Sequence, residues 1–324
     1  MNPPVLSVVV VVVSDTVGRS AGLVPLARCL EALERQTDPP ETEIIVPYLP
    51  RDEEVGELDR LARRFPRVLF LAVRDVRPPA GAGREHHDSL RARGLAAARG
   101  EIVALLEDHA RPDPRWCGRL VEAHRLPHAA IGGAIENDVD RPLNWAVYFC
   151  DFHRYMNPVP DGAADGVSDA NVSFKRRSLE AVRPVWDGSF QEPAVNAALA
   201  EGGQTMALFP DIVVIQHREE LRPIDALKER FVWGRSYAAA RGAATTRGRR
   251  ISLIALSPAL PLLLTARMAH TVADRGRLGR AFLRALPWTL LLTTSWSLGE
   301  LTGYVAGRST ARTDPQDVRK GRTP

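Results

Sequence analysis

The sequence predicts an α/β fold, with a doubly wound, mostly parallel sheet followed by a helical C-terminal extension. From residue 5 to residue 108, β-branched runs alternate with amphipathic stretches, which is typical of parallel strands joined by helices. Residues 221–324 instead combine long apolar stretches with arginines. A chain of 324 residues with 45% apolar side chains can fill a large core and still carry an appendage.

The first predicted unit is a strand over residues 5–13, VLSVVVVVV, followed by the helix-spaced stretch LVPLARCLEALERQ. The valine run is too short to span a membrane and fits a buried strand. Strand and helix patterns then alternate through TEIIVPYL, VGELDRLARRF, RVLFLAV, HDSLRARGLAAARG and EIVALLED. These segments predict four parallel strands, the fourth ending near residue 108.

The pattern becomes less regular after Trp116. We expect a helix in WCGRLVEAHRL, a strand in AAIGGAIE, a helix in PAVNAALAEGG and strand segments in TMALFPDIVVIQH. A long amphipathic helix, PIDALKERFVWGRSYAAARG, leads to the basic RGRR. The sequence thus predicts a domain over residues 1–220, a helical basic region over 221–307 and a flexible tail over 308–324.

A polar cluster follows the fourth predicted strand. Glu107, Asp108 and His109 come directly after its apolar run, and Pro112 and Pro114 prevent the strand from continuing. In an open α/β sheet, ligands bind beyond the carboxyl ends of the strands. We therefore expect these three side chains to lie at a ligand site.

Charge is distributed unevenly along the chain. Residues 221–324 hold 18 Lys and Arg against 6 Asp and Glu, a charge of +12, and residues 1–220 carry −8. The basic residues alternate with ISLIALSPALPLLL and LPWTLLLTTSWSLG, a pattern that suits an anionic membrane surface better than a nucleic acid. We therefore predict a membrane partner and no nucleic-acid partner.

The two apolar runs predict attachment without a full span. Each has about 14 residues, fewer than the roughly 20 that a spanning helix needs, and prolines at positions 258, 261 and 287 interrupt them. We expect peripheral or re-entrant attachment, with the packing of these helices on the body as the alternative. Because the opening MNPP lacks the features of a secretory signal, we place the protein on the cytoplasmic face of the cell membrane.

The cysteines favour a reducing compartment. Cys29, Cys117 and Cys150 lie far apart, are odd in number and form no CxxC pair. Neither a disulfide framework nor a thiolate zinc site is predicted.

Five segments, in order, resemble the family 2 glycosyltransferases. They are RARGLAAARGEIVALLEDHARPDPRW, IGGAIE, DANVSFKRRSLEAV, QEPAVNAALAEGG and FPDIVVIQH. The likeness covers roughly residues 5–240. It implies a GT-A fold, also called the nucleotide-diphospho-sugar transferase fold, and transfer of a sugar from a nucleotide-sugar donor with inversion.

The resemblance assigns the polar cluster to the donor. Glu107, Asp108 and His109 occupy the family's Asp-x-Asp motif, whose acids hold the ribose and a divalent metal, Mn²⁺ or Mg²⁺, on the diphosphate. The last position is normally a carboxylate, and here it is His109, a usable but less suitable ligand for Mn²⁺. His217, at the end of VVIQH, matches a histidine that in some members completes the metal or diphosphate site.

The resemblance also assigns the nucleotide base and the acceptor. Arg91 matches an arginine near the base, and Asp15 lies after the first strand, where a polar residue meets the base. The second strand lacks the family's uracil-reading aspartate, so the base stays open. Glu192, eleven residues before Gly203, matches the general base, with Gln191 in place of the acid that usually precedes it.

Each assigned residue also has a structural interpretation. Glu192 could be an acid favoured by a helix N-terminus, and Asp15 could be a helix cap. Arg91 could be a solvated helix residue, and His217 a satisfied strand-end histidine. The adjacent His86, His87 and Asp88 imitate a metal cluster, but we expect a polar helix start there.

The function predicted is an inverting glycosyltransferase that acts on a lipid-linked or polysaccharide glycan of the cell envelope. One alternative is a sugar nucleotidylyltransferase, which would require a glycine-rich basic loop after the first strand, and SDTVGRSAG matches that loop poorly. The other is a non-catalytic binding subunit, which His109 and the second strand leave open.

Overall fold

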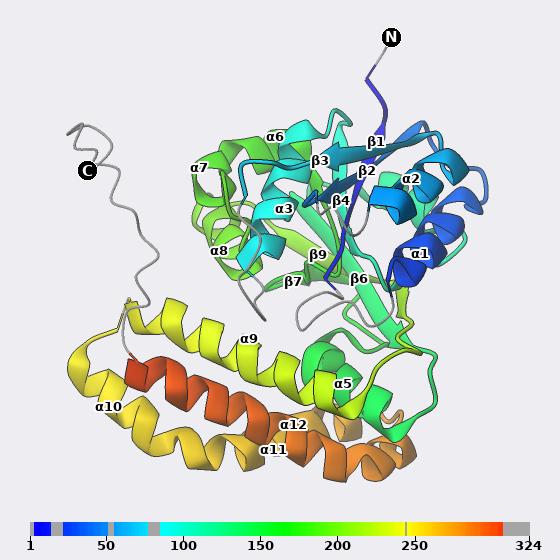
Figure 1. Cartoon of the computed structure of the whole chain (residues 1–324). Helices are drawn as coiled ribbons and strands as arrows, with labels where there is room; N and C mark the ends of the chain where they lie inside the picture. Colours follow the sequence, from blue (N-terminus) through cyan, green and yellow to red (C-terminus); the bar gives the residue numbers. More distant parts are fainter. Residues whose placement is uncertain (1–2, 14–21, 51–54, 77–84, 244, 307–324) are drawn as a thin grey trace, which may run out of the picture.

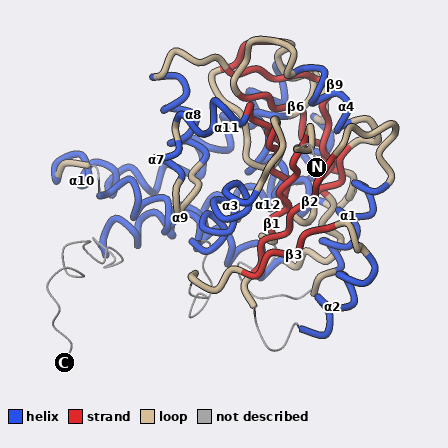
Figure 2. The backbone as a smooth tube through the Cα atoms, turned by 90° about the horizontal axis from the view of Figure 1, so that it is seen from above, coloured by secondary structure: helices blue, strands red, loops and turns tan. Residues whose placement is uncertain are grey.

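The structure is a computed structural model that describes residues 3–13, 22–50, 55–76, 85–243 and 245–306 (Figure 1). A sheet with helices on its faces forms the body, and a layer of long helices lies along one side of it. Seen from above, this layer extends past the sheet on one side (Figure 2). The predicted tail over residues 308–324 lies outside the described residues.

The first half of the sheet is the predicted parallel unit. Its strands, in the spatial order β3-β2-β1-β4, are all parallel. The strands are β1 (Leu6–Val11), β2 (Thr42–Tyr48), β3 (Val68–Ala72) and β4 (Ile102–Glu107). The helices that follow the first three strands are α1 (Val24–Glu34), α2 (Val55–Arg64) and α3 (Glu85–Ala97). The alternation read from the sequence is confirmed here.

Valines of β1 fill the core on both faces of the sheet. Val9 and Val11 belong to one buried cluster, and Val8 and Val10 to the cluster on the other face. Each of these four side chains has 0% exposure. Successive side chains of a strand point to opposite faces, so a strand covered on both sides needs an uninterrupted apolar run.

The second half of the sheet is mixed rather than mostly parallel. β8 runs antiparallel to both β4 and β6, whereas β6 and β9 are parallel. β5 and β7 pair antiparallel with β9. The elements are β5 (Ala110–Pro112), α4 (Trp116–Ala123), β6 (Ala130–Asn137), α5 (Pro142–Phe152), η2 (His153–Tyr155), β7 (Gly162–Ala164), β8 (Asn171–Lys175), α6 (Arg176–Ala181), α7 (Arg183–Trp186), α8 (Glu192–Glu201) and β9 (Met206–Gln216).

A short strand stands where the sequence predicted a turn. β4 ends at Glu107, and the chain pairs again at Ala110 as the edge strand β5. Pro112 is tolerated there because an edge strand can leave one N–H position facing away from the ladder.

The helical layer packs closely on the body. It consists of α9 (Pro223–Ala243), α10 (Arg247–Leu256), η3 (Ser257–Ala259), α11 (Leu260–Asp274) and α12 (Gly279–Ala306). A Cβ built on Gly299 of α12 would lie 2.1 Å from the carbonyl oxygen of Phe231 in α9, so the two helices meet backbone to backbone. On the side of the body, the rings of Phe282 and Phe149 in α5 pack edge to face, 5.1 Å apart.

The prolines do not divide the C-terminal helices as predicted. Residues Arg247–Asp274 form one helical segment of 28 residues, with a mean hydropathy of 1.6 in its most apolar window. Pro258 and Pro261 lie in the first turns of η3 and α11, where a missing N–H costs little, and Pro287 lies inside α12. By its length and composition alone, the segment could cross a membrane.

Candidate active site

One cavity of about 2180 Å³ extends from the carboxyl end of β4 to the helical layer. Four residues singled out in the sequence line it: Arg91, Glu107, His109 and Glu192. A site for a drug-sized ligand is typically about 300–1,000 Å³. The cavity therefore has room for two ligands at once.

Close packing of α3 on the sheet places Arg91 at the strand ends. A Cβ at Gly94 would lie 2.3 Å from Cγ1 of Val9 and 3.2 Å from Cγ of Pro47, so a glycine is needed where the helix crosses β1 and β2. Arg91, one turn earlier, reaches the cavity. Pro47 thus packs against α3 in the strand that lacks the family's aspartate.

Arg91 is the centre of a buried acidic cluster. Its guanidinium lies 3.0 Å from a carboxylate oxygen of Asp169, 3.2 Å from Glu107 and 3.3 Å from Asp88. Burial alone would lower the pKa of Arg91, but Asp169, Glu107 and Asp88 raise it. Arg91 has 3% exposure, so the interpretation as a solvated helix residue is wrong.

Asp108 faces the backbone of the first strand. Its Oδ1 accepts a hydrogen bond of 3.0 Å from the amide of Val13, and its amide donates to the carbonyl of Val11. Asp108 has 1% exposure and is not among the residues that line the cavity. In this structure it fixes the strand end, and its predicted contact with ribose or metal stays a prediction.

His109 lies between the two acids of the motif. Its Nε2 is 3.4 Å from Glu107, and its Nδ1 is 3.4 Å from Asp108. Burial opposes protonation, but these two carboxylates raise the pKa of His109 to about 9, and in return His109 and Arg91 lower the pKa of buried Glu107. The ring is therefore cationic at neutral pH.

His217 lies beside the motif without joining it. Its amide donates to the carbonyl of His109, and its Nδ1 is 2.7 Å from Asp138. It does not line the cavity. Within the described residues, no three His, Cys, Asp or Glu side chains are arranged to hold a metal ion. The assignment of Asp108, His109 and His217 as metal ligands stays a prediction.

Glu192 begins α8 and contacts Asp169, which also binds Arg91. Its carboxylate accepts a 3.3 Å hydrogen bond from the Asp169 amide and a 3.2 Å bond from Nδ2 of Asn196. Burial, and then the charge of Asp169, raise the pKa of Glu192 to about 8. A half-buried carboxyl with a pKa raised toward neutrality can exchange a proton with a substrate.

Several cavity residues were missed in the sequence. Asp169 connects Arg91 to Glu192, Gln216 and Arg218 line the cavity near the motif, and Arg154 lines it near Glu192. Asp169 lies in the quoted segment DANVSFKRRSLEAV, which was the available signal for it. The predicted polar helix start at His86, His87 and Asp88 is confirmed by α3. Asp15 lies outside the described residues.

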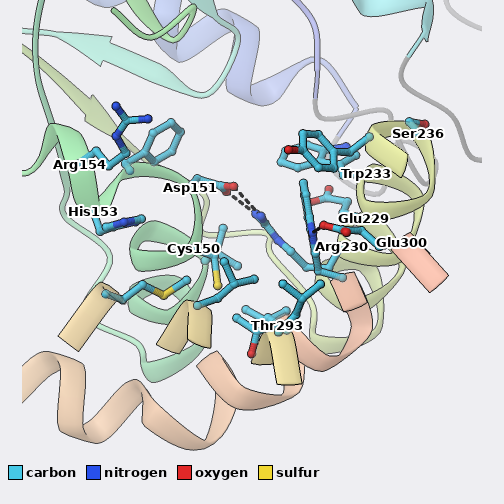
Figure 3. A pocket seen from close by; sticks show the side chains of 18 of the residues that line it. Cys150, Asp151, His153, Arg154, Glu229, Arg230, Trp233, Ser236, Thr293 and Glu300 are labelled. Carbon is cyan, nitrogen blue, oxygen red and sulfur yellow. Dashed lines mark hydrogen bonds and ion pairs between the residues drawn. The ribbon is translucent and has the colours of Figure 1, made fainter. Parts of the chain in front are cut away.

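Buried ion pairs join α5, α9 and the end of β9 below this site. Both guanidinium nitrogens of Arg230 bind the carboxylate of Asp151 (Figure 3), and Arg218 lies 2.8 Å from Glu229. Removing one partner of such a pair strands a buried charge, which typically costs about 3–5 kcal/mol. The pairs therefore fix the helical layer relative to the cavity.

The mixed sheet, the acidic strand end and the helical C-terminal region define a GT-A type of fold. Residues 23–183 match the family model described as glycosyl transferase family 2, and the chain belongs to this family. It is a glycosyltransferase by family, as the sequence motifs implied.

Two solved structures are similar over most of the chain. One is the mannosyltransferase PcManGT from Pyrobaculum calidifontis in complex with GDP-Man and Mn²⁺, at 18% identity and a TM-score of 0.48, covering 94% of this chain and 86% of that one. The other is S. aureus TarS 1-349 in complex with UDP, at 12% identity and a TM-score of 0.43, covering 93% and 91%. No curated protein matches the sequence.

Proposed function

We propose that the protein is an inverting glycosyltransferase that moves a sugar from a nucleotide-sugar donor to a hydroxyl group of a lipid-linked or polysaccharide glycan. The observation that supports it most is the position of Glu192. This carboxyl has a raised pKa and lines the same cavity as Arg91 and Glu107, the residues assigned to the donor.

The proposed reaction is a single displacement. Glu192 takes the proton of the acceptor hydroxyl while that oxygen bonds to the anomeric carbon of the donor sugar. The bond from that carbon to the diphosphate breaks, and the electron pair leaves with the nucleoside diphosphate. One displacement without an enzyme nucleophile inverts the anomeric centre, and a positioned base typically contributes about 10²–10⁴-fold.

Asp169 has a positioning role in this proposal. Its amide donates to Glu192, and its carboxylate binds Arg91. One residue thus fixes the base relative to the donor end of the cavity. Preorganised contacts of this kind keep the reacting groups in the productive geometry.

A divalent metal suits the charge of the donor end. The described carboxylates there are Asp88, Glu107, Asp108 and Asp169, and the cations are Arg91 and His109. Two negative charges are in excess where a diphosphate has to bind. Mg²⁺ and similar ions in nucleotide sites use one or two protein ligands plus phosphate oxygens, so a three-ligand protein cage is not required.

Glu107 and His109 are the motif residues that line the cavity and would hold the ion, and His109 would have to lose its proton to do so. A bound metal would supply positive charge to the departing diphosphate. Mn²⁺ or Mg²⁺ dependence remains part of the proposal.

Donor binding tests the proposed function directly. Thermal unfolding of the full chain would be followed with a panel of nucleotide-sugars, each with and without Mn²⁺. A bound donor raises the melting temperature by mass action. We expect one donor to stabilise the protein, more strongly with Mn²⁺, and to be hydrolysed slowly without an acceptor. Binding without any hydrolysis or transfer would support a non-catalytic subunit instead.

We also propose that the helical layer attaches the protein peripherally to the cytoplasmic face of the cell membrane. Ile251 and Leu262 are exposed by 66% and 69%, although each lies in an apolar stretch of the layer, and Leu283 of α12 is exposed by 69%. Arginines of the same helices would contact anionic headgroups, which the charge of +12 on residues 221–324 favours.

Membrane fractionation tests the attachment. Headgroup attraction is screened within about 8 Å at physiological ionic strength, so a peripheral protein should leave the membrane progressively as salt rises. Release by detergent alone would show a spanning anchor, and a fully soluble protein at low salt would show that the layer binds no membrane.

A further inference from the structure

We propose that the acceptor is a lipid phosphate or diphosphate whose hydrocarbon chain enters the part of the cavity between the body and helices α9 to α11. We call this part the acceptor arm, and its marker residues are Trp233, Leu253, Leu260, Leu263, Leu264 and Arg267. The inference rests on the proposed function and decides between its two acceptor classes.

The acceptor arm is continuous with the site of the predicted base. Glu192 and Leu263 line the same cavity, although one begins α8 and the other lies in α11. A nucleotide-sugar at Arg91 would occupy less than half of about 2180 Å³ if it fills a usual ligand volume of about 300–1,000 Å³. The remaining volume lies toward the helical layer.

The wall of the acceptor arm is apolar from Leu253 in α10 to Leu264 in α11, and arginines line it on either side of this stretch. Leu253, Leu260 and Leu264 are half-buried there, and Leu263 is 54% exposed. The neighbouring Leu262 is exposed by 69% but does not line the cavity, so α11 presents one leucine to the arm and the next to the outer surface. A hydrocarbon chain could thus pass from a bilayer into the arm without leaving apolar surroundings.

The uncompensated charge of the acceptor arm is positive. Its acids are Asp151, Glu229 and Glu300. Asp151 binds Arg230 (Figure 3), Glu229 binds Arg218, and the charge of Arg241 acts on Glu300. By contrast, no carboxylate of a described residue lies within 4.0 Å of the guanidinium of either Arg154 or Arg267, which also line the cavity. Guanidinium groups bind phosphate through paired hydrogen bonds.

Both guanidinium groups belong to residues that line the same cavity as Glu192 and the leucines of the arm. Burial lowers the pKa of His153, and the charges of Arg154 and Arg267 lower it further. The charge of Arg154 also lowers the pKa of Glu192. A phosphate bound by these arginines would therefore lie in the cavity that contains both the predicted base and the apolar arm. A water-soluble polysaccharide would gain nothing from that apolar wall.

Binding of a short prenyl phosphate to the full chain tests the inference without any sugar transfer. The probes are farnesyl phosphate, farnesol and inorganic phosphate, each below its aggregation concentration. Trp233 and Trp296 line the cavity, so a bound probe should change their fluorescence. We expect saturable binding of farnesyl phosphate, binding of farnesol weaker by about tenfold, as the loss of a charged hydrogen bond predicts, and no response to phosphate.

Paired variants separate the arm from the outer surface. Leu263→Gln should weaken farnesyl phosphate binding by about fivefold, whereas Leu262→Gln on the outer surface should leave it unchanged. Arg267→Gln should abolish the preference for farnesyl phosphate over farnesol. Arg280→Gln, an exposed arginine of α12 outside the cavity, is its control.

Equal effects of Leu262→Gln and Leu263→Gln would show that the probe binds only the outer surface, and would overturn the inference. So would absence of binding in a protein that still binds and hydrolyses a nucleotide-sugar. The opposite pattern, prenyl phosphate binding without any nucleotide-sugar binding, would retain the acceptor arm and overturn the proposed function instead.

Discussion

Strand β1 and the helical segment over residues 247–274 are both strongly apolar, but they differ in what covers them. The valines of β1 are fully buried, in clusters on both faces of the sheet. Only 17% of the most apolar window of the helical segment is buried. The apolar character of β1 is explained by its place in the core. The helical segment leaves apolar side chains exposed to water, and an exposed apolar patch usually marks a site that binds a protein, a membrane or a ligand.

The two regions have different proposed roles. Sugar transfer takes place at the ends of the strands, where Arg91, Asp169 and Glu192 are connected. The helices attach the protein to the membrane and, on our inference, bind the acceptor. Variants in one region should therefore leave the property of the other unchanged.

The largest expected effect is on the chemistry. Glu192→Gln keeps the shape of the side chain but cannot accept the proton, so transfer should fall by about 10²–10⁴-fold. Donor affinity, measured by equilibrium binding, should stay within about threefold, because the base acts on the acceptor. Membrane partitioning should not change. Donor affinity that falls as much as the rate would show that Glu192 holds the donor rather than the acceptor proton.

The second effect concerns the packing of α12 on α9 within the helical layer. Gly299→Leu places a side chain against the backbone of α9, since even its Cβ would lie 2.1 Å from the Phe231 carbonyl. Overpacking of this kind typically costs about 1–3 kcal/mol of unfolding free energy, which urea denaturation measures. Gly279→Leu in the same helix is the control, because a Cβ at that position meets no atom within 4 Å. Equal losses would show that α12 does not dock on α9 through its glycines.

The third effect is the pH dependence of transfer, which tests the role of Glu192 as the base. The carboxyl of Glu192 has its pKa raised to about 8, mainly by burial, and only its deprotonated form can act as a base. The kcat/KM for transfer should therefore rise by about tenfold per pH unit below 8 and level off above it. Glu192→Gln should remove this rise from its residual activity. A flat profile of the wild type below pH 8 would exclude Glu192 as the titrating base.

The smallest effect concerns the exposed helices. Ile251→Gln and Leu262→Gln together should lower the membrane-bound fraction severalfold in vesicle sedimentation, since full burial of such a side chain is worth about 1.5–3 kcal/mol. Leu69→Gln is the control, because Leu69 is 49% exposed but belongs to β3 in the body. If Leu69→Gln lowers binding equally, the helical layer has no special part in attachment.

The parallel half of the fold could be predicted because its signal is local. Each strand buried on both faces shows a continuous apolar run, as residues 5–13 do, and each helix shows helical spacing. The antiparallel β8 could not be placed this way, because no strand-helix alternation precedes it and an apolar run does not show the direction in which a strand pairs with its neighbours. The prolines at 258 and 261 misled because a proline in the first turn of a helix is tolerated, and Pro287 misled because α12 continues through it.

The resemblance to the family identified Arg91, Glu107 and Glu192, which line the same cavity, but it did not predict the contacts among them. That Asp169 connects Arg91 to Glu192 depends on how β8, α3 and α8 meet. The position of Asp108 against the Val13 amide likewise depends on the register of β1 and β4. Spacing along the chain contains no record of such contacts. The acceptor arm was missed for the same reason, because its walls come from α5, α9, α10 and α11.

The packing of Phe149 in α5 against Phe282 in α12 has a consequence for the biosynthesis of the protein. More than a hundred residues separate these two rings, and a ribosome adds about 5–20 residues per second, so α5 waits on the order of ten seconds for its partner helix. During that interval the sheet can already form, while an aromatic face of α5 stays open to water. Transiently exposed apolar surface of this kind makes a nascent chain prone to aggregation, and α12 is the helix that covers it.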